Sequence, residues 1–355
     1  MSNFQNKILK NEKGIWRHAN FYSEFIKPEN RLSLGGGINS IHKTIKIKSF
    51  KNIYFKREDE NKCGSLKDRS LAYQVSLAKQ NNLKSLVIST SGNAGISAAA
   101  YCQKAGIKLY IFISPETEKA KIAPMQKYEP EIIKSKKAIR LANYLSAKYK
   151  IKNLRPSVDN DSIEGFKSIA FEIFEELGEI DALFTFVTSG SSFAGIGRAY
   201  KYLLENKEIK KMPRLFAAQS GDIFSVAGEF NNMEISQLEG EQALVRLQAG
   251  RFGVKDTRRK KEIINFIKSS GGSGMYVTEN EVGKAKDILN QNNIHTSAEG
   301  CASFAGVLKI NKENKFKKIV CVLSGKARDE IGEIDESRIY KAESFNEVGG
   351  IVSSI

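Results

Sequence analysis

Residues 54–70 read YFKREDENKCGSLKDRS, a stretch that predicts a strand, a charged turn and a helix in succession. The strand covers Ile53 to Lys56, and the helix begins near Lys67, just after Gly64 and Ser65. A lysine is unusual at a helix start, because the positive end of the helix dipole disfavours an ammonium group. The same field favours a neutral, nucleophilic amine. Lys67 is therefore a candidate nucleophile, with a solvated surface lysine as the alternative interpretation.

The composition indicates a chain with a sizeable core, since 41% of its 355 residues are hydrophobic. This length suits two domains or one large α/β unit. The formal net charge is +16, from 56 Lys and Arg against 40 Asp and Glu. The lysines are scattered, and the densest basic cluster, RRKKE at 258–262, is short. We interpret the charge as compositional bias with some attraction for anionic substrates, and we expect no nucleic-acid partner.

The cysteine and histidine contents indicate the redox compartment and argue against a metal site. Four cysteines show neither a CxxC pair nor disulfide-rich spacing, which is typical of a reducing compartment. Three histidines are too few for a multi-histidine metal site, so we expect no metal. The first residues lack the apolar core of a signal peptide, and no apolar run reaches membrane-spanning length. We expect a soluble, cytoplasmic protein without a membrane partner.

From residue 52 onward, strand and helix patterns alternate. Apolar runs predict strands at 86–90, 109–114, 182–188, 214–219 and 318–324. Helical patterns cover 67–80, 93–105, 138–149, 163–177, 194–204, 279–290 and 298–309, and another helix is expected to open at 115–117. Such alternation predicts parallel sheets with helices on both faces. The predicted fold class is α/β, with two three-layer αβα units built on parallel or mixed twisted sheets.

The same pattern divides the chain into four segments. Residues 1–50 are irregular, contain the only tryptophan, and are expected to pack on the core. A boundary near Arg155-Pro156 separates an N-terminal α/β domain, 51–160, from a C-terminal α/β domain, 161–340, and a tail follows at 341–355. The glycine cluster at 35–37 predicts a tight turn, because no GxGxxG motif joins a strand to a helix there.

Loops of small polar residues follow the predicted strands, and open parallel sheets bind ligands at this edge. The first loop, STSGNAGIS at 89–97, exposes backbone N–H groups at a helix start and suits a carboxylate. The amide of Asn93 can also hydrogen-bond a cofactor hydroxyl. A tight turn without a ligand is the alternative. The predicted substrate-binding residues are Ser91, Gly92, Asn93, Ala94 and Gly95.

The second loop, VTSGSSFAGIGR at 187–198, suits a phosphate through its hydroxyls, its N–H groups and the helix dipole. It lacks the GxxxxGK[ST] pattern of a nucleotide P-loop, which favours a phosphate monoester over a triphosphate. A third loop, VLSGKARDE at 322–330, places the hydroxyl of Ser324 where it can bond a ring nitrogen without charging it. The candidate cofactor-binding residues of the second loop are Ser189, Gly190, Ser191, Ser192 and Gly195.

A lysine, an amide, a phosphate cradle and a neutral partner for a ring nitrogen are together what pyridoxal 5′-phosphate (PLP) requires. The chain resembles the fold-type II PLP enzymes, the tryptophan synthase β-like superfamily, and most of all the threonine synthases. GSLKDRS resembles the GSFKDRG motif of these enzymes, and STSGNAG resembles their substrate-carboxylate loop. TSGSSFAG resembles the phosphate loop, and LSGKARD resembles a LTGHGLKD-type segment. The four motifs occur in the family's order.

This resemblance implies a PLP-dependent carbon–oxygen lyase with the cofactor in the cleft between the two units. Lys67 would hold PLP as a Schiff base and take the substrate α-proton. Asn93 would face the O3′ of PLP, and Ser324 would lie beside its pyridine nitrogen. The implied reaction converts O-phospho-L-homoserine and water to L-threonine and phosphate, in amino-acid biosynthesis. The family is commonly dimeric, so we expect a homodimer.

Several positions depart from the family pattern and leave alternatives open. The chain reads GGGINSI at 35–41 where the family has GEGxTPL, and Cys63, interpreted as a buried small residue or a substrate-lining thiol, replaces a threonine. One alternative is β-replacement or β-elimination on O-phosphoserine, serine or threonine, as in cysteate synthase-, cysteine synthase- or dehydratase-like relatives. Another is a catalytically silent ligand-binding protein. The candidates for binding the leaving group are Lys56, Arg198, Lys326 and Arg328.

Overall fold

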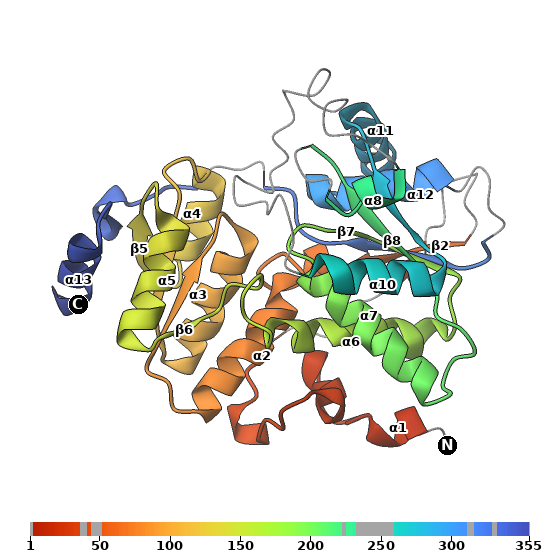
Figure 1. The fold of residues 1–355 in the computed structure, drawn as a ribbon, viewed down its shortest axis with the longest axis horizontal. Coiled ribbons are helices and arrows are strands. Elements are labelled where there is room, and N and C mark those ends of the chain that lie inside the picture. Colours follow the sequence, from red (N-terminus) through yellow and green to blue (C-terminus); the bar gives the residue numbers. More distant parts are fainter. Residues whose placement is uncertain are drawn as a thin grey trace.

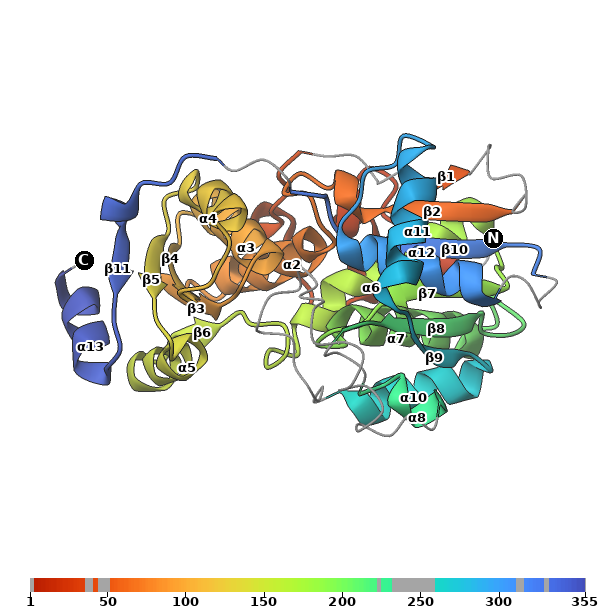
Figure 2. The ribbon, with the colours of Figure 1, turned by 90° about the horizontal axis from the view of Figure 1, so that it is seen from above.

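The computed structural model describes residues 3–35, 41–43, 52–221, 225–231, 259–310, 316–328 and 332–354. These residues form two lobes, each built on a sheet with helices on both faces (Figures 1 and 2). One sheet has six strands and the other has five, and all described strand pairs are parallel except β1 with β2. The predicted α/β class with two three-layer units is confirmed.

The smaller sheet has the strand order β11-β5-β4-β3-β6. Leu86 and Ile88 of β3 (Ser85–Ser89) pack with α2 and α3 on one face, while Val87 packs with α5 on the other. This strand is therefore buried on both sides, as its continuous apolar run predicted. The elements of this lobe are β3 (Ser85–Ser89), β4 (Lys108–Ile113), β5 (Glu131–Lys134), β6 (Lys152–Asn153), β11 (Ile339–Lys341), α2 (Lys67–Gln80), α3 (Asn93–Ala105), α4 (Lys119–Gln126), α5 (Ala138–Tyr149) and α13 (Phe345–Ser354).

The larger sheet has the order β1-β2-β10-β7-β8-β9. Helices α6, α7 and α10 share a core with one face, and α11 and α12 share a core with the other. The elements of this lobe are β1 (Ile41–Lys43), β2 (Ile53–Arg57), β7 (Ala182–Phe186), β8 (Arg214–Gln219), β9 (Ser273–Tyr276), β10 (Ile319–Leu323), α6 (Ser162–Leu177), α7 (Ser191–Glu205), α8 (Gly228–Asn231), α10 (Lys260–Ser270), α11 (Glu279–Asn290) and α12 (Ala298–Ile310).

The N-terminal residues pack against helices of both lobes. Trp16 belongs to the core that contains α2 and α3, whereas Phe4 and Phe21 belong to the core that contains α6 and α7. The indole Nε1 of Trp16 donates a hydrogen bond to the carbonyl oxygen of Leu32 at 2.7 Å. Short helical turns make up this segment and two later connections: α1 (Asn3–Lys7), η1 (Gly14–Phe21), η2 (Pro28–Asn30), η3 (Glu58–Glu60) and η4 (Glu336–Arg338). Of the expected turn at 35–37, only Gly35 lies within the described residues.

The predicted domains would assign the strands before residue 160 to one sheet and the later strands to the other. Two strands belong instead to the sheet of the opposite domain. Strand β2, from the predicted N-terminal domain, pairs with β10 in the larger sheet, where Phe55 packs against Phe304 of α12. Strand β11, from the predicted C-terminal domain, pairs with β5 in the smaller sheet. The chain thus crosses between the lobes just before α2, and the crossing places the start of α2 where the lobes meet.

The element predictions differ from the structure in a few places. The helix expected to open at 115–117 instead begins at Lys119, and strands β1, β5, β6, β9 and β11 had no sequence prediction. Among the described residues, no helix is both long enough and apolar enough to span a membrane.

Candidate active site

A cavity of about 170 Å³ lies where the two lobes meet, at the carboxyl ends of β3, β7 and β10. Its walls come from the starts of α2, α3 and α7 and from the end of β10, so segments distant in sequence converge here. Eight of the predicted site residues line it: Lys67, Ser91, Gly92, Asn93, Ala94, Ser189, Ser192 and Ser324. Gly95, Gly190, Ser191 and Gly195 are not among the described residues that line it.

Backbone pairing between two loops holds the start of α2 at this cavity. The amide of Leu66 donates to the carbonyl of Ser324 at 3.0 Å, and the amide of Lys326 donates to the carbonyl of Gly64 at 2.8 Å. Gly64 has φ +79°, and a Cβ there would lie 3.1 Å from Nη2 of Arg328. Both the conformation and this close approach favour glycine in the turn before Lys67.

The amine of Lys67 is suited to nucleophilic and base chemistry. Burial lowers its pKa to about 8, and the nearby carboxylate of Glu299 raises it in part. Nζ lies 5.5 Å from the centroid of the Phe166 ring, which gives the amine an apolar neighbour. Lys67 is also the first residue of α2, where the dipole disfavours the ammonium form. At this pKa a substantial fraction of the amine is neutral near pH 8.

The predicted carboxylate loop opens α3. The methylenes of Lys121 pack so close to Gly92 that a Cβ there would lie 3.0 Å from Cδ of Lys121. Gly95 has a different role, since a Cβ there would lie 2.5 Å from Cγ2 of Thr90 and 2.9 Å from Cε of Met125. Gly95 allows close packing of α3, which accounts for a glycine at this position outside the cavity wall.

The predicted phosphate loop opens α7 after Gly190, which has φ +80°. Ser189 and Ser192 line the cavity, whereas the Ser191 hydroxyl donates to the carbonyl of Pro156 at 2.7 Å. Gly195 faces α6, because a Cβ there would lie 2.6 Å from Cβ of Phe166. Ser191 and Gly195 were predicted to bind the cofactor. The Ser191 hydroxyl and the close packing at Gly195 anchor the loop to the segment before α6 and to α6 itself.

None of the four cations proposed for the leaving group is among the described residues that line the cavity. Lys56 is fully buried and its Nζ lies 2.5 Å from the carboxylate of Glu172. Arg198 pairs with Glu262 at 2.7 Å, and the side chain of Lys326 is exposed. The fourth, Arg328, contacts Asn93 from outside the cavity wall. Cys63 is buried and does not line the cavity either.

Sequence reasoning did not single out three charged residues of the cavity wall: Lys121, Arg155 and Glu299. Lys121 is buried and pairs with Glu118 at 3.2 Å, and Arg155 is half-buried. Glu299 is the one carboxylate among the described residues that line the cavity. With Lys67, the wall carries three basic groups and one acidic group, a balance that favours an anionic ligand.

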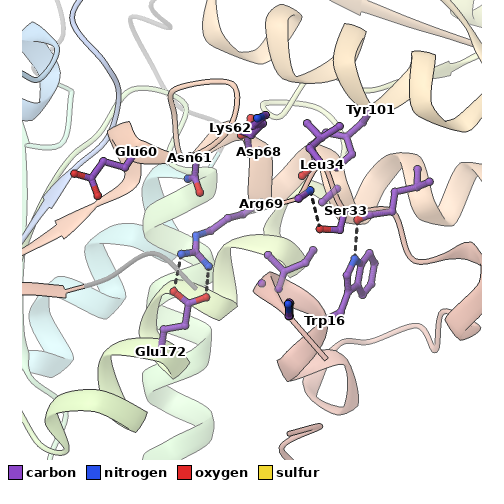
Figure 3. A pocket seen from close by; sticks show the side chains of 16 residues that line it. Trp16, Ser33, Leu34, Glu60, Asn61, Lys62, Asp68, Arg69, Tyr101 and Glu172 are labelled. Atoms are coloured by element: carbon purple, nitrogen blue, oxygen red, sulfur yellow. Dashed lines mark hydrogen bonds and ion pairs between the residues drawn. The ribbon is translucent and has the colours of Figure 1, made fainter. Parts of the chain in front are cut away.

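A second cavity, of about 220 Å³, is lined in part by residues at the start of α2 (Figure 3). Lys67 lines the first cavity, and its neighbours Asp68 and Arg69 line the second. Figure 3 shows the guanidinium of Arg69 reaching Glu172 through two hydrogen bonds, each of 2.7 Å. None of the predicted substrate or cofactor residues lines this second cavity, so the candidate active site is the first.

Two α/β lobes with a lysine at a helix start between them define a fold-type II PLP enzyme. Residues 37–325 match the sequence pattern of the family described as pyridoxal-phosphate dependent enzyme. The match covers most of the chain, which therefore belongs to this family and uses PLP.

Individual relatives agree with this assignment. The chain is 26% identical over 340 residues to a threonine synthase of Methanocaldococcus jannaschii, covering 90% of this chain and 82% of that protein. It is 28% identical over 283 residues to a threonine synthase of Halalkalibacterium halodurans, covering 77% and 76%.

Solved structures share the fold. A PLP-dependent aspartate racemase superposes with a TM-score of 0.66 and 20% identity, over 82% of this chain and 88% of that one. An O-acetylserine-dependent cystathionine β-synthase from Helicobacter pylori superposes with a TM-score of 0.66 and 20% identity, over 82% and 94%. These enzymes differ in chemistry, so the fold leaves the substrate open.

The residues of the first cavity fit PLP. Lys67 supplies the amine, Asn93 an amide, Ser324 an uncharged hydroxyl, and the start of α7 supplies backbone N–H groups with hydroxyls beside them. The Oγ of Ser89, which also lines the cavity, is buried and has no hydrogen-bond partner among the described residues. Buried hydroxyls are normally hydrogen-bonded, so this one is consistent with a site built for a polar ligand.

Proposed function

We propose that this enzyme converts O-phospho-L-homoserine and water to L-threonine and phosphate. The observation that carries the proposal is the placement of Lys121 and Arg155 in the same cavity as Lys67 and the loop at the start of α3. A substrate with a carboxylate and a phosphate needs more positive charge than PLP chemistry alone requires. The relatives named threonine synthase support the same reaction.

The substrate would be held at its two anionic ends. The loop from Ser91 to Ala94 faces the cavity at the start of α3, where backbone N–H groups suit the carboxylate. Lys121 and Arg155 would bind the phosphate that leaves. Both are long side chains whose stems are at least half-buried, so less rotamer freedom remains to be lost on binding.

When bound, PLP supplies an electron sink for negative charge that develops at the substrate α-carbon. Lys67 would accept the α-proton at Nζ, for which its pKa of about 8 is well matched near neutral pH. Ser189, Ser192 and the first N–H groups of α7 would hold the cofactor phosphate. The hydroxyl of Ser324 does not enforce protonation of a ring nitrogen as a carboxylate would. That favours elimination and replacement over transamination.

A phosphate-release assay tests the proposal. PLP-loaded protein is given O-phosphohomoserine and O-phosphoserine in parallel, and the products are identified by mass. Threonine from the first substrate supports the proposal, and Lys67→Ala should abolish its formation. Phosphate released only from O-phosphoserine would favour β-replacement or β-elimination instead. Release from neither would exclude the proposed reaction and elimination from O-phosphoserine, and the same product analysis would then be made with serine and threonine.

We further propose that the enzyme works as a homodimer in the cytoplasm, in the amino-acid biosynthesis that its reaction serves. Light scattering on the purified protein tests the dimer, and fractionation of cells that express it tests the compartment. A monomer of 39.5 kDa with full activity would exclude a required dimer.

A further inference from the structure

Arg328 contacts the candidate site through Asn93 without lining the cavity itself. Its Nε donates to Oδ1 of Asn93 at 3.2 Å, and its Nη2 donates to the carbonyl of Cys63 at 2.6 Å. The two acceptors belong to different loops, one at the start of α3 and one before α2. A single guanidinium therefore links the loop that follows β10 to both loops of the smaller lobe.

This contact determines which way the Asn93 amide points. The oxygen and nitrogen of an amide are hard to distinguish by shape, but a guanidinium has only donors and can only approach the oxygen. The NH₂ group must then point elsewhere. It lies beside the loop at the end of β10, since a Cβ on Gly325 would be 3.1 Å from Nδ2. Ser324, which directly precedes Gly325, lines the cavity.

Further hydrogen bonds close a ring through these segments. The Ser97 hydroxyl lies 2.6 Å from Oδ1 of Asp68 and 3.1 Å from the carbonyl of Asn93. The amide of Cys63 donates to Oδ2 of Asp68 at 2.8 Å. Because Asp68 follows Lys67 directly, the ring of Arg328, Asn93, Ser97, Asp68 and Cys63 fixes Asn93 relative to the lysine. A shift of Arg328 would release only the amide, since the backbone of Asn93 is held separately.

We propose that Arg328 is a positioning residue that orients the Asn93 amide with its NH₂ toward the cavity. In this orientation the amide donates a hydrogen bond to the O3′ oxygen of PLP. The inference rests on the proposed role of Asn93, but not on the identity of the amino-acid substrate. A donor stabilises the anionic form of that oxygen, whereas a reversed amide would present its own oxygen and repel it. Loss of Arg328 allows the reversed amide.

The test is a double-mutant cycle on cofactor binding, measured without substrate. Wild type, Arg328→Met, Asn93→Ala and the double variant are titrated with PLP, and the visible absorbance of the bound cofactor is followed against pH. We expect Arg328→Met to weaken PLP binding by about tenfold, the effect of one hydrogen bond to a charged group. The absorbance change should move to higher pH, because the anionic oxygen loses its donor. Lys326→Met removes the same charge from the same loop and should behave as wild type.

The decisive comparison is made in the Asn93→Ala background. If Arg328 acts through Asn93, adding Arg328→Met there changes neither the affinity nor the pH profile. The proposal is overturned if Arg328→Met has the same effect in the wild-type and Asn93→Ala backgrounds. A role of Arg328 through Cys63 would produce that result. An Arg328→Met profile identical to that of Lys326→Met also overturns the proposal.

A second variant covers the case in which Arg328→Met does not fold. If Arg328→Met fails to fold, Arg328→Lys enters the same cycle, since lysine keeps the charge but lacks the fork that reaches both acceptors. Coupling between Arg328 and Asn93 together with a negative phosphate-release assay would retain this inference and reject the proposed reaction. The two failures are therefore distinguishable.

Discussion

Glu299 and Lys67 line the same cavity, and the Glu299 carboxylate raises the pKa of the Lys67 amine. Burial lowers the pKa of the Lys67 amine to about 8, and the Glu299 carboxylate works in the opposite direction. Glu299 lies in the first turn of α12, on the opposite lobe from α2. The protonation of the lysine therefore depends on both lobes and not only on the helix that carries it.

Replacing Glu299 by Gln should make Lys67 react with PLP at lower pH. The neutral amine is the reactive form, so the rate of PLP incorporation into the apoprotein should rise with pH through about 8 in wild type. Without the carboxylate the pKa falls further, and the midpoint moves down. Stopped-flow absorbance across the pH range measures it. Glu279→Gln, in the first turn of α11, is the matched control, and a Glu299→Gln profile that overlays wild type contradicts the coupling.

Lys121→Met and Arg155→Met should each raise the KM for the phosphorylated substrate by about tenfold, the value of one charge-assisted hydrogen bond. The affinity for PLP should change little, because these side chains are assigned to the leaving phosphate. Steady-state kinetics and a cofactor titration measure the two effects separately. Lys119→Met, which removes an exposed charge from α4, serves as the control. Weaker PLP binding with an unchanged KM would assign the two cations to the cofactor instead.

The helices near the site could be predicted closely from local signals. The predicted bounds 67–80 and 93–105 agree with α2 and α3, and α3 directly follows a glycine, Gly92. Gly106, at φ +65°, ends α3 in the left-handed conformation that glycine accommodates. The sheet to which each strand belongs was harder to predict. Strands β2 and β11 pair with strands far away in sequence, and local periodicity does not indicate such pairing.

The site was predictable where small residues follow strands and not where charged side chains reach it. Ser189, Ser192 and Ser324 were identified because each lies in a small-residue segment that follows a strand. Lys121 and Arg155 were not, because only tertiary packing brings these two side chains to the cavity. A small residue in these loops does not by itself indicate a ligand site, because the same loops also use small residues for close helix packing.

Gly195→Ala tests this distinction between packing and binding. A Cβ there would lie 2.6 Å from Cβ of Phe166 and 2.8 Å from the carbonyl of Ile163, so the variant should lose about 1–3 kcal/mol of unfolding free energy. Gly283→Ala in α11 is the control: a Cβ there meets nothing within 4 Å, and alanine should add about 0.5–1 kcal/mol. Urea denaturation of both apoproteins measures the difference. Stability equal to wild type in Gly195→Ala would show that the helices can separate at no cost.

Glu172→Gln should be the most destabilising of these changes, because Glu172 joins two buried cations. Its carboxylate lies 2.5 Å from Nζ of Lys56 and 2.7 Å from Nη2 of Arg69, and all three side chains are almost fully buried. Burial opposes its ionisation, but the charges of Arg69 and Lys56 outweigh that effect and hold the pKa of Glu172 well below its usual range. Removing one partner of such a network typically costs about 3–5 kcal/mol.

The pH dependence of unfolding gives this last prediction a second measurement. A carboxyl whose pKa is depressed in the folded protein contributes stability above its unfolded pKa, about 4.3, and loses it as the pH falls toward the folded value. Wild type should therefore lose stability below about pH 4.3 more steeply than Glu172→Gln, which has no group to protonate there. Glu205→Gln breaks an exposed pair with Lys201 and should stay within about 0.5 kcal/mol of wild type at every pH. If Glu172→Gln matched Glu205→Gln at neutral pH, the buried network would contribute nothing to the docking of α2 on α6.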